Sequence, residues 1–402
     1  MSRKVGSTDV EHIGGIRIVS RVADLLDKIC SVSKYLNAFA LVVFFGMVGI
    51  TFVDVFMRYI VKSPLKGVKD VVEVMLVLVV AFTVAHVYNI RGHITVDLIT
   101  GKLSESNRRI LAFITTLIML MFVAVVLRQE VVQTITYLES GKTNGVVAIV
   151  PCYPFQGALA LGFLLMLLMC IRDVLRHIVD AVQQGTRPWQ WLLIVGVPVL
   201  FWVFLYFWTQ PDLWSMSNAV MGVVGLVIMF VLMFAGVPTG FAMMIAGYAM
   251  ISNIRGVATG LYTVGNQIFA TTSNYTWSVV GFFTLMGMFC FYLKFGDDIF
   301  TCVQKFLGHV KGGLAIVTIG ASALLGAVVG DNNSVVSTMS AIAYPQMKKH
   351  NYDDSLAAGV MAAGSGLGPL IPPSTGFIIF GSLTGVSVGQ LFVAGVIPGI
   401  VM

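Results

Sequence analysis

Polar residues interrupt a long apolar stretch in the last third of the chain: Gly330, Asp331, Asn332, Asn333 and Ser334. Side-chain oxygens and backbone carbonyls freed from a helix are the groups that replace the water shell of a hard cation such as sodium. The same run also fits a solvated polar turn. We therefore treat these five residues as a candidate cation site, to be weighed with other oxygen donors near them.

A second interruption follows, where glycines and prolines cluster between residues 364 and 374. Proline removes a backbone donor and glycine loosens a helical turn, so an apolar helix is expected to break here. Such a break must line a cavity or lie within protein, because hydrocarbon cannot satisfy its polar groups. A half-helix starting after Pro372 and Pro373 would also present free amides to an anion. The candidate cation ligands here are Gly366 and Gly368, and the candidate substrate ligands are Ser365, Pro369, Ser374 and Thr375.

Other ionisable residues permit weaker hypotheses. His93 and Asp97 could shuttle protons, although a contact at the membrane surface or a structural cap is favoured. Asp54 and Glu73 lie in apolar spans, where a functional role and a helix-to-helix hydrogen bond are equally open. No serine–histidine–aspartate order, phosphate loop or zinc-binding spacing is present. We expect no catalytic residue, no cofactor and no metal except sodium as a coupling ion, which favours a transporter over an enzyme.

The composition indicates a protein surrounded by lipid. Of 402 residues, 57% are hydrophobic and 11% are charged, and the mean hydropathy is +0.90, whereas a soluble domain has about 25% charged residues. The net charge of +6 comes from basic residues in short loops, which is typical of membrane topology and does not indicate nucleic-acid binding. Most of these residues fall on the side of the N-terminus, which predicts that the N-terminus is cytoplasmic.

Helical periodicity divides the chain into surface helices and spans. Apolar residues recur among charges within 16–36 and again between 297 and 311, which predicts two amphipathic helices on the membrane surface. A less regular stretch is expected between 255 and 278. Segments long enough to cross about 30 Å of hydrocarbon are predicted at 38–59, 70–90, 109–128, 149–171, 191–208, 218–235, 239–254 and 279–293.

The lysines that flank the polar run predict a hairpin. Lys311 and Lys348 both fall on the inner side, whereas one straight crossing between them would place them on opposite faces. A re-entrant hairpin that turns at Gly330–Ser334 would keep both on one face, with arms at 312–329 and 335–347. The alternative is two complete spans, which the arm lengths barely permit at about 1.5 Å per residue.

Several motifs together resemble the membrane component of the tripartite ATP-independent periplasmic (TRAP) transporters, with the small and large subunits fused. The small-subunit resemblance covers residues 20–185, and the large-subunit resemblance begins near residue 214. At the hairpin tip the family usually has Ser-Gly-Ser, whereas this chain has Val329–Asn332. The motifs are His93–Asp97, Gly145 with Pro151, Gly236–Phe241, Gly308–Leu314, Pro345–Lys349 followed by Tyr352 and Asp353, Gly368–Ser374, Gly385–Phe392 and Ile397–Gly399.

The resemblance implies an all-α, polytopic membrane fold with four regions. These are a cytoplasmic N-terminus with an interfacial helix (1–36), a four-span scaffold bundle (37–185), a linker with an extra span (186–213), and the first half of an elevator-type transport domain with one re-entrant hairpin and one broken helix (214–402). The large subunits of this family have two inverted halves. A second half, in a longer natural chain or in a separate one, is therefore expected to be needed for transport.

The implied activity is secondary active transport, a sodium symport of a small organic anion of the carboxylate class. A periplasmic substrate-binding protein would deliver the anion, and the hairpin domain would move against the scaffold within the lipid bilayer. The main alternative is a truncated, non-transporting scaffold or assembly subunit of such a complex. An unrelated ion channel is disfavoured, because nothing in the sequence indicates a continuous pore.

Overall fold

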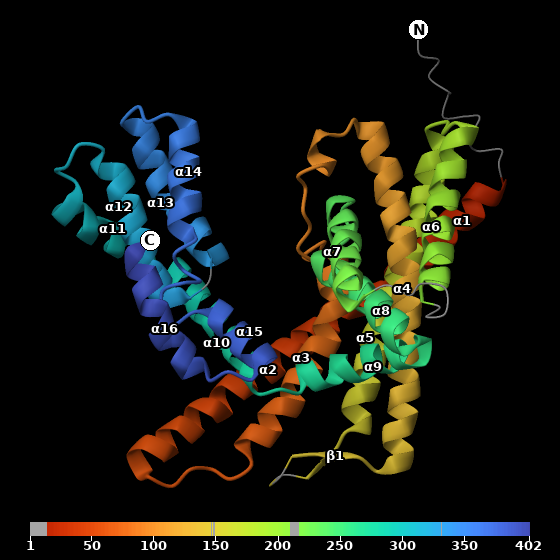
Figure 1. The fold of residues 1–402 in the computed structure, drawn as a ribbon, viewed down its shortest axis with the longest axis horizontal. Coiled ribbons are helices and arrows are strands. Elements are labelled where there is room, and N and C mark those ends of the chain that lie inside the picture. Colours follow the sequence, from red (N-terminus) through yellow and green to blue (C-terminus); the bar gives the residue numbers. More distant parts are fainter. Residues whose placement is uncertain (1–13, 146, 148, 210–216, 331) are drawn as a thin grey trace. The chain divides into compact units, whose positions relative to one another are not determined.

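Residues 14–145, 147, 149–209, 217–330 and 332–402 are described by the computed structural model of this chain. Within them, α-helices are joined by short loops (Figure 1), and one two-stranded hairpin is present. The all-α fold class expected from the sequence is confirmed. The chain divides into two compact units, Met1–Ser273 and Asn274–Met402.

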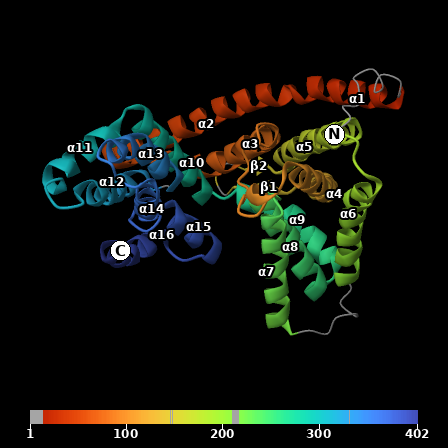
Figure 2. The same ribbon diagram turned by 90° about the horizontal axis from the view of Figure 1, so that it is seen from above.

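The first unit begins with two helices that follow one another almost without interruption and are seen side-on in Figure 2. The first of them exposes Ile18, Val22, Leu25 and Ile29 at helical spacing, as expected for a helix with one face in the membrane surface. The elements are α1 (Gly14–Cys30), α2 (Val32–Phe56) with a π-helical turn η2 (Met57–Val61), α3 (Val68–Asn89), a 3₁₀ turn η3 (Thr100–Lys102), α4 (Glu105–Ser140), β1 (Thr143–Asn144), β2 (Val150–Pro151) and α5 (Tyr153–Gln183).

Large apolar side chains fill the space between α3, α4 and α5. Phe122, Met166 and Met169 are completely buried there. At one point α3 and α5 approach backbone to backbone, because a Cβ on Gly162 would lie 2.1 Å from the carbonyl oxygen of Ala81. Among the described residues, five helices are long and apolar enough to cross a membrane: the α1–α2 pair, α3, α4, α5 and α6 (Pro188–Trp208).

A charged cluster fastens α1 to this bundle. Buried Arg172 of α5 bonds to Asp27 of α1 at 3.3 Å, to Asn89 at the end of α3 at 2.7 Å, and to its neighbour Asp173 at 2.7 Å. Arg176 pairs with the other oxygen of Asp27. Because every charge in the cluster has a partner, it can lie partly buried at the ends of apolar helices. The cluster therefore holds the surface helix against the scaffold.

Three further helices complete the first unit after α6, namely α7 (Asn218–Phe234), α8 (Thr239–Arg255) and α9 (Val257–Thr272). The sequence had predicted a less regular stretch where α9 lies, and that expectation is wrong. Glycines and polar residues weaken the apolar period of this segment, but two of the glycines allow close packing. A Cβ on Gly260 would overlap the hydroxyl of Ser252 in α8, and one on Gly265 would lie 3.2 Å from Cβ of Gln129 in α4.

The second unit contains the two interruptions singled out in the sequence. Large buried side chains from both hairpin arms form its core, including Leu325, Met339 and Met347. The arms expected at 312–329 and 335–347 correspond to α12 and α13. The helices are α10 (Thr276–Tyr292), α11 (Phe295–Leu307), α12 (Gly313–Val329), α13 (Asn332–Lys349), α14 (Asp354–Ser365), α15 (Thr375–Thr384) and α16 (Val388–Val401).

Candidate functional site

Gly330 ends α12 at the expected hairpin tip. Its φ of +66° is the left-handed conformation that favours glycine, and its N–H bonds to the carbonyl of Gly326 at 2.7 Å. Asn332 at the start of α13 is exposed, and Ser334 is half-buried. Asp331 and the side chain of Asn333 lie outside the described part of the structure. The tip is thus a sharp helix-to-helix turn with polar residues on its α13 side.

The predicted helix break separates α14 from α15. α14 ends at Ser365, and tight turns follow, in which the N–H of Gly368 bonds to the carbonyl of Ser365 at 3.0 Å. α15 begins after Ser374, whose buried hydroxyl donates to the carbonyl of Pro369 and accepts the N–H of Phe377 at 3.4 Å. The side chain of Ser374 therefore replaces the helical backbone bonds that the prolines remove.

The hairpin tip and the helix break lie against each other. The carbonyl oxygen of Gly330 accepts two hydrogen bonds from Thr375, one from its N–H at 3.0 Å and one from its hydroxyl at 2.9 Å. A Cβ on Gly330 would lie 2.5 Å from the carbonyl oxygen of Pro373, and one on Gly326 would lie 2.7 Å from Cα of Gly368. The structure therefore brings these two parts of the candidate site together, backbone against backbone.

The oxygens at this contact differ in their freedom to bind a cation. The carbonyl of Gly330 uses its two lone pairs on Thr375, so in this arrangement it positions the tip. The hydroxyl of Ser365 donates to the carbonyl of Ala362 within its own helix at 2.9 Å. A hydroxyl that donates to a carbonyl keeps lone pairs for a ligand. Thr375 and Ser365 can therefore offer neutral oxygens to a ligand at this contact.

Sequence reasoning missed a polar stripe on α12 that faces the same region. Thr318, Ser322 and Gly326 recur every four residues, which places them on one face of the helix. Ser322 is fully buried, and its hydroxyl has no hydrogen-bond partner among the described residues. A Cβ on Gly364 of α14 would lie 2.9 Å from that hydroxyl. The four-residue spacing within an apolar helix was the signal that could have identified Ser322.

The two acidic residues predicted within spans have local partners. Asp54 accepts a hydrogen bond from Arg58 at 2.6 Å and from the backbone N–H of Leu65 at 3.0 Å, so it closes the loop after α2. Glu73 accepts a hydrogen bond from Asn144 at 3.1 Å. These contacts favour the structural interpretation of both residues over the functional one.

The predicted His93–Asp97 pair is not joined by a hydrogen bond or ion pair within the described residues. The ring of His93 packs against Tyr88 and Phe241, with ring centres 6.3 Å and 5.6 Å away, and burial lowers its pKa below the ordinary value. Asp97 accepts a hydrogen bond from the hydroxyl of Thr100 at 3.1 Å. The ring of His93 therefore packs among aromatic side chains, which favours a structural role over a proton shuttle.

Comparison with known families assigns both parts of the chain. Residues 47–180 match the DctQ component of the tripartite ATP-independent periplasmic transporters, and residues 226–402 match their DctM component. This chain belongs to the TRAP transporter permeases. It carries a small-subunit and a large-subunit domain in one polypeptide, as the motifs indicated, and both family descriptions are of transporter components and not of enzymes. The chain is therefore a multi-pass membrane protein, in agreement with its long apolar helices.

Named TRAP permeases are among its relatives. The sialic acid TRAP transporter permease protein SiaT of Haemophilus influenzae is 24% identical over 89% of this chain and 58% of its own length. The sialic acid TRAP transporter large permease protein SiaM of Vibrio cholerae is 32% identical over 42% of this chain and 39% of its own length. The C4-dicarboxylate TRAP transporter large permease protein DctM of Pseudomonas aeruginosa is 33% identical over 34% of this chain and 32% of its own length.

The TRAP permease chain described here spans less than two thirds of each of these relatives. It covers 58% of SiaT, which it matches along most of its own length. Its matches to the large permease proteins extend over 39% and 32% of those proteins. Substrates and partners named for the relatives therefore belong to longer proteins.

Proposed function

We propose that this chain is part of a sodium-coupled secondary transporter, a symporter, that takes up a small organic anion of the carboxylate class. One observation carries the proposal: the carbonyl of Gly330 accepts both hydrogen bonds from Thr375, which joins the hairpin tip to the helix break. Discontinuous helices meeting in this way supply ion and substrate sites in secondary transporters. The relatives named for sialic acid and C4-dicarboxylates support a carboxylate substrate.

The proposed ligands surround this contact. Sodium is assigned to the tip residues 331–334, which Gly330 positions, together with the backbone around Gly366 and Gly368. The substrate is assigned to the hydroxyls of Ser365, Ser374 and Thr375 and to the turn at Pro369. α15 begins at Thr375, so the positive end of its helix dipole lies at the break and favours an anionic group there.

The proposed mechanism is that of an elevator. The chain packs as two compact units, each with its own core, which such a mechanism requires. The unit that holds the tip and the break would move through the membrane, and the unit that holds α3, α4 and α5 would act as the scaffold. We place the protein in the inner membrane with its N-terminus in the cytoplasm. A periplasmic binding protein would deliver the anion, and a second half of the large subunit, in the same or another polypeptide, would complete the site.

The proposed hairpin is re-entrant. α12 has 17 residues, which at 1.5 Å per residue is about 25 Å and less than the roughly 30 Å of a bilayer core. Cysteines introduced by Lys311→Cys and Lys348→Cys should both react with an impermeant thiol reagent from the cytoplasmic side only. Labelling of the two positions from opposite sides would replace the hairpin by two full spans.

Uptake by proteoliposomes tests the proposed coupling. The full transporter, reconstituted with its binding protein, should accumulate the anion only when a sodium gradient is imposed. Asn333→Ala and Ser334→Ala should each weaken the dependence on sodium, whereas Ser355→Ala, at an exposed position of α14 near its start, should leave it unchanged. Unaltered sodium activation in both tip variants would remove the tip from the cation site. A folded assembly without sodium-driven uptake would favour the alternative of a non-transporting scaffold.

A further inference from the structure

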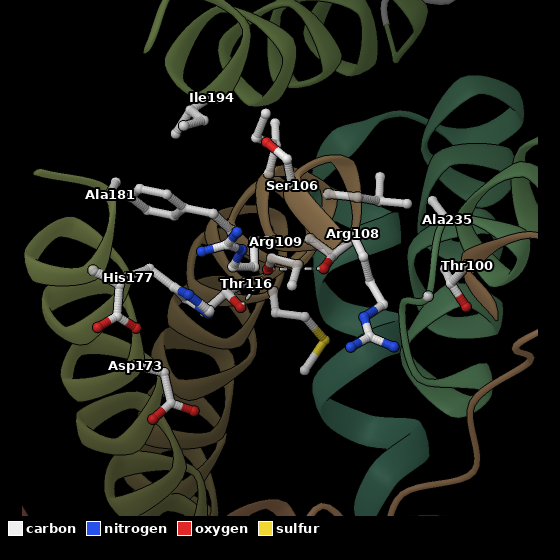
Figure 3. Close-up of a pocket in the computed structure, with 18 of the residues that line it drawn as sticks. Thr100, Ser106, Arg108, Arg109, Thr116, Asp173, His177, Ala181, Ile194 and Ala235 are labelled. Atoms are coloured by element: carbon white, nitrogen blue, oxygen red, sulfur yellow. Dashed lines mark hydrogen bonds between the residues drawn. The ribbon is translucent and has the colours of Figure 1, made fainter. Parts of the chain in front are cut away.

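A large pocket lies in the first unit, and no residue of the tip or the break lines it. Its volume is about 950 Å³, and it is enclosed by the loop after α3, the first turns of α4, the last turns of α5 and the start of α6. Figure 3 shows Arg108 and Arg109 of α4 between His177 and Asp173 of α5 on one side and Thr100 on the other. The pocket is not used by the proposed transport site, and arginines outnumber carboxylates in its lining.

Four arginines line this pocket, namely Arg91, Arg108, Arg109 and Arg187. Within the part of the chain that the structure describes, none of them forms an ion pair. The Nε of Arg109 donates to the carbonyl of Glu105 at 3.2 Å, which leaves its terminal N–H groups for another acceptor. The pocket therefore contains several guanidinium groups whose charge has no carboxylate in contact.

The acidic residues of the pocket are fewer and are partly engaged. Asp173 is held by Arg172 at 2.7 Å, and Asp97 accepts a hydrogen bond from Thr100 at 3.1 Å. Asp180 is the remaining carboxylate of the lining. Because Arg172 compensates Asp173, the pocket keeps an excess of positive charge. An anion with several acceptor oxygens would satisfy it.

The pocket also has an apolar side that continues onto a membrane-spanning helix. Ile110, Phe113 and Ile194 line it, and Phe113 contacts the Trp191 ring with centres 6.3 Å apart. On the opposite face of α6 from Ile194, Leu192 is 73% exposed, as expected for a side chain that faces lipid. Aromatic and basic residues at the end of an apolar span mark the headgroup layer of a membrane. A ligand with a charged head and hydrocarbon tails fits such a pocket better than a wholly soluble anion.

We propose that this pocket binds the phosphate group of an anionic phospholipid from the adjacent leaflet, with Arg108 and Arg109 as its main ligands. Guanidinium groups bind phosphate oxygens in pairs, which a point charge does not. Basic pockets between membrane-spanning helices at this depth are suited to lipid headgroups. The bound lipid would fill the space between α4, α5 and α6 and tie them at the membrane surface.

Native mass spectrometry of the purified full chain tests the proposal. After delipidation, phosphatidylglycerol is added back at increasing concentration to the unmodified chain and to a double variant, R108A/R109A. The double variant should bind phosphatidylglycerol at least about tenfold more weakly. The matched control is Arg128→Ala on the same helix, at an exposed position that does not line the pocket, which should bind as the unmodified chain does. Equal loss in the control and the double variant would overturn the proposal.

Two further measurements test the role of charge at these positions and distinguish a lipid from a soluble phosphate compound. R108K/R109K should regain part of the affinity, because lysine keeps the charge but lacks the paired geometry. Binding as weak as that of R108A/R109A would show that positive charge at these two positions does not attract the lipid and would overturn the proposal. Soluble glycerol 3-phosphate, in excess, should not displace phosphatidylglycerol. Full displacement would assign the pocket to a soluble phosphate compound and overturn the lipid assignment.

Discussion

The two units achieve close packing by different means. In the first, unbroken helices are separated by large side chains such as Phe122 and Met166, and α3 and α5 approach closely at Gly162, in the middle of a helix. In the second, the close approaches occur where helices end, at Gly330 against Pro373 and at Gly326 against Gly368. Side-chain packing makes a uniform, rigid bundle, whereas backbone contact at helix ends brings carbonyls and amides together. In the second unit, therefore, regular helix is interrupted at the points where polar backbone groups meet.

The largest effect is expected from Gly330→Ala. The alanine must adopt a left-handed backbone conformation, which costs about 1–2 kcal/mol. Its Cβ would also lie 2.5 Å from the carbonyl oxygen of Pro373. Gly385→Ala is the matched control, because Gly385 has φ +74° with no atom within 4 Å of the added Cβ. Thermal unfolding and sodium-driven uptake should both be affected more strongly in Gly330→Ala. Equal effects in the two variants would show that the tip and the break do not press on one another.

A smaller effect is expected from Thr375→Val. Valine keeps the shape and the backbone bond to Gly330 but removes the hydroxyl bond, which contributes about 1 kcal/mol. Thr384→Val on the same helix is the control, because that exposed hydroxyl bonds only within α15, to Phe380 at 2.7 Å. Uptake measured against sodium concentration should require more sodium in Thr375→Val than in the control. A purely structural role would lower the unfolding temperature and leave the sodium requirement unaltered.

The smallest effect concerns an exposed ion pair at the other end of the same hairpin. Lys348 at the end of α13 bonds to Asp354 at 2.6 Å, and this hydrogen bond lowers the pKa of Asp354 below its ordinary value. The pair therefore stabilises the fold above the ordinary pKa range of an aspartate, and that contribution is lost as pH falls through the lowered pKa. Both side chains are more than half exposed, so the gain is slight.

The contribution of the Lys348–Asp354 pair is measured by comparing the unfolding of the unmodified chain and of Lys348→Ala across acidic pH. The small difference between them should vanish at the acid end of the range. A difference that persists there would assign the effect of Lys348 to packing and not to charge.

The sequence anticipated those features that depend on local chemistry. The polar run and the lysines that flank it located the tip at Gly330–Ser334. Glycine and proline located the break before Ser374, because they weaken or interrupt a helix wherever they occur. It could not anticipate the bond from Thr375 to Gly330, which joins residues far apart in the chain. α9 was missed because the small residues that let it pack, such as Gly260, also weaken the hydrophobic period.

The arginines of the basic pocket illustrate a second limit. In the sequence, Arg91, Arg109 and Arg187 contribute only to the count that predicts orientation. Three different segments carry them to one pocket, and no short-range pattern contains that information. The buried hydroxyl of Ser322 is an intermediate case, since its spacing from Thr318 was visible but its position opposite Gly364 was not.

The position of α6 has a consequence for subunit stoichiometry. The DctQ match ends at residue 180 and the DctM match begins at residue 226, with α6 between them, yet the first compact unit continues to Ser273. DctM-matched α9 therefore packs in the same core as DctQ-matched α4, where the hydroxyl of Tyr137 donates to Asn266 at 3.2 Å. If the two parts were separate polypeptides, this contact would have to form between molecules and would weaken on dilution. The covalent connection through α6 makes the encounter intramolecular, so one copy of each part is always present whatever the expression level.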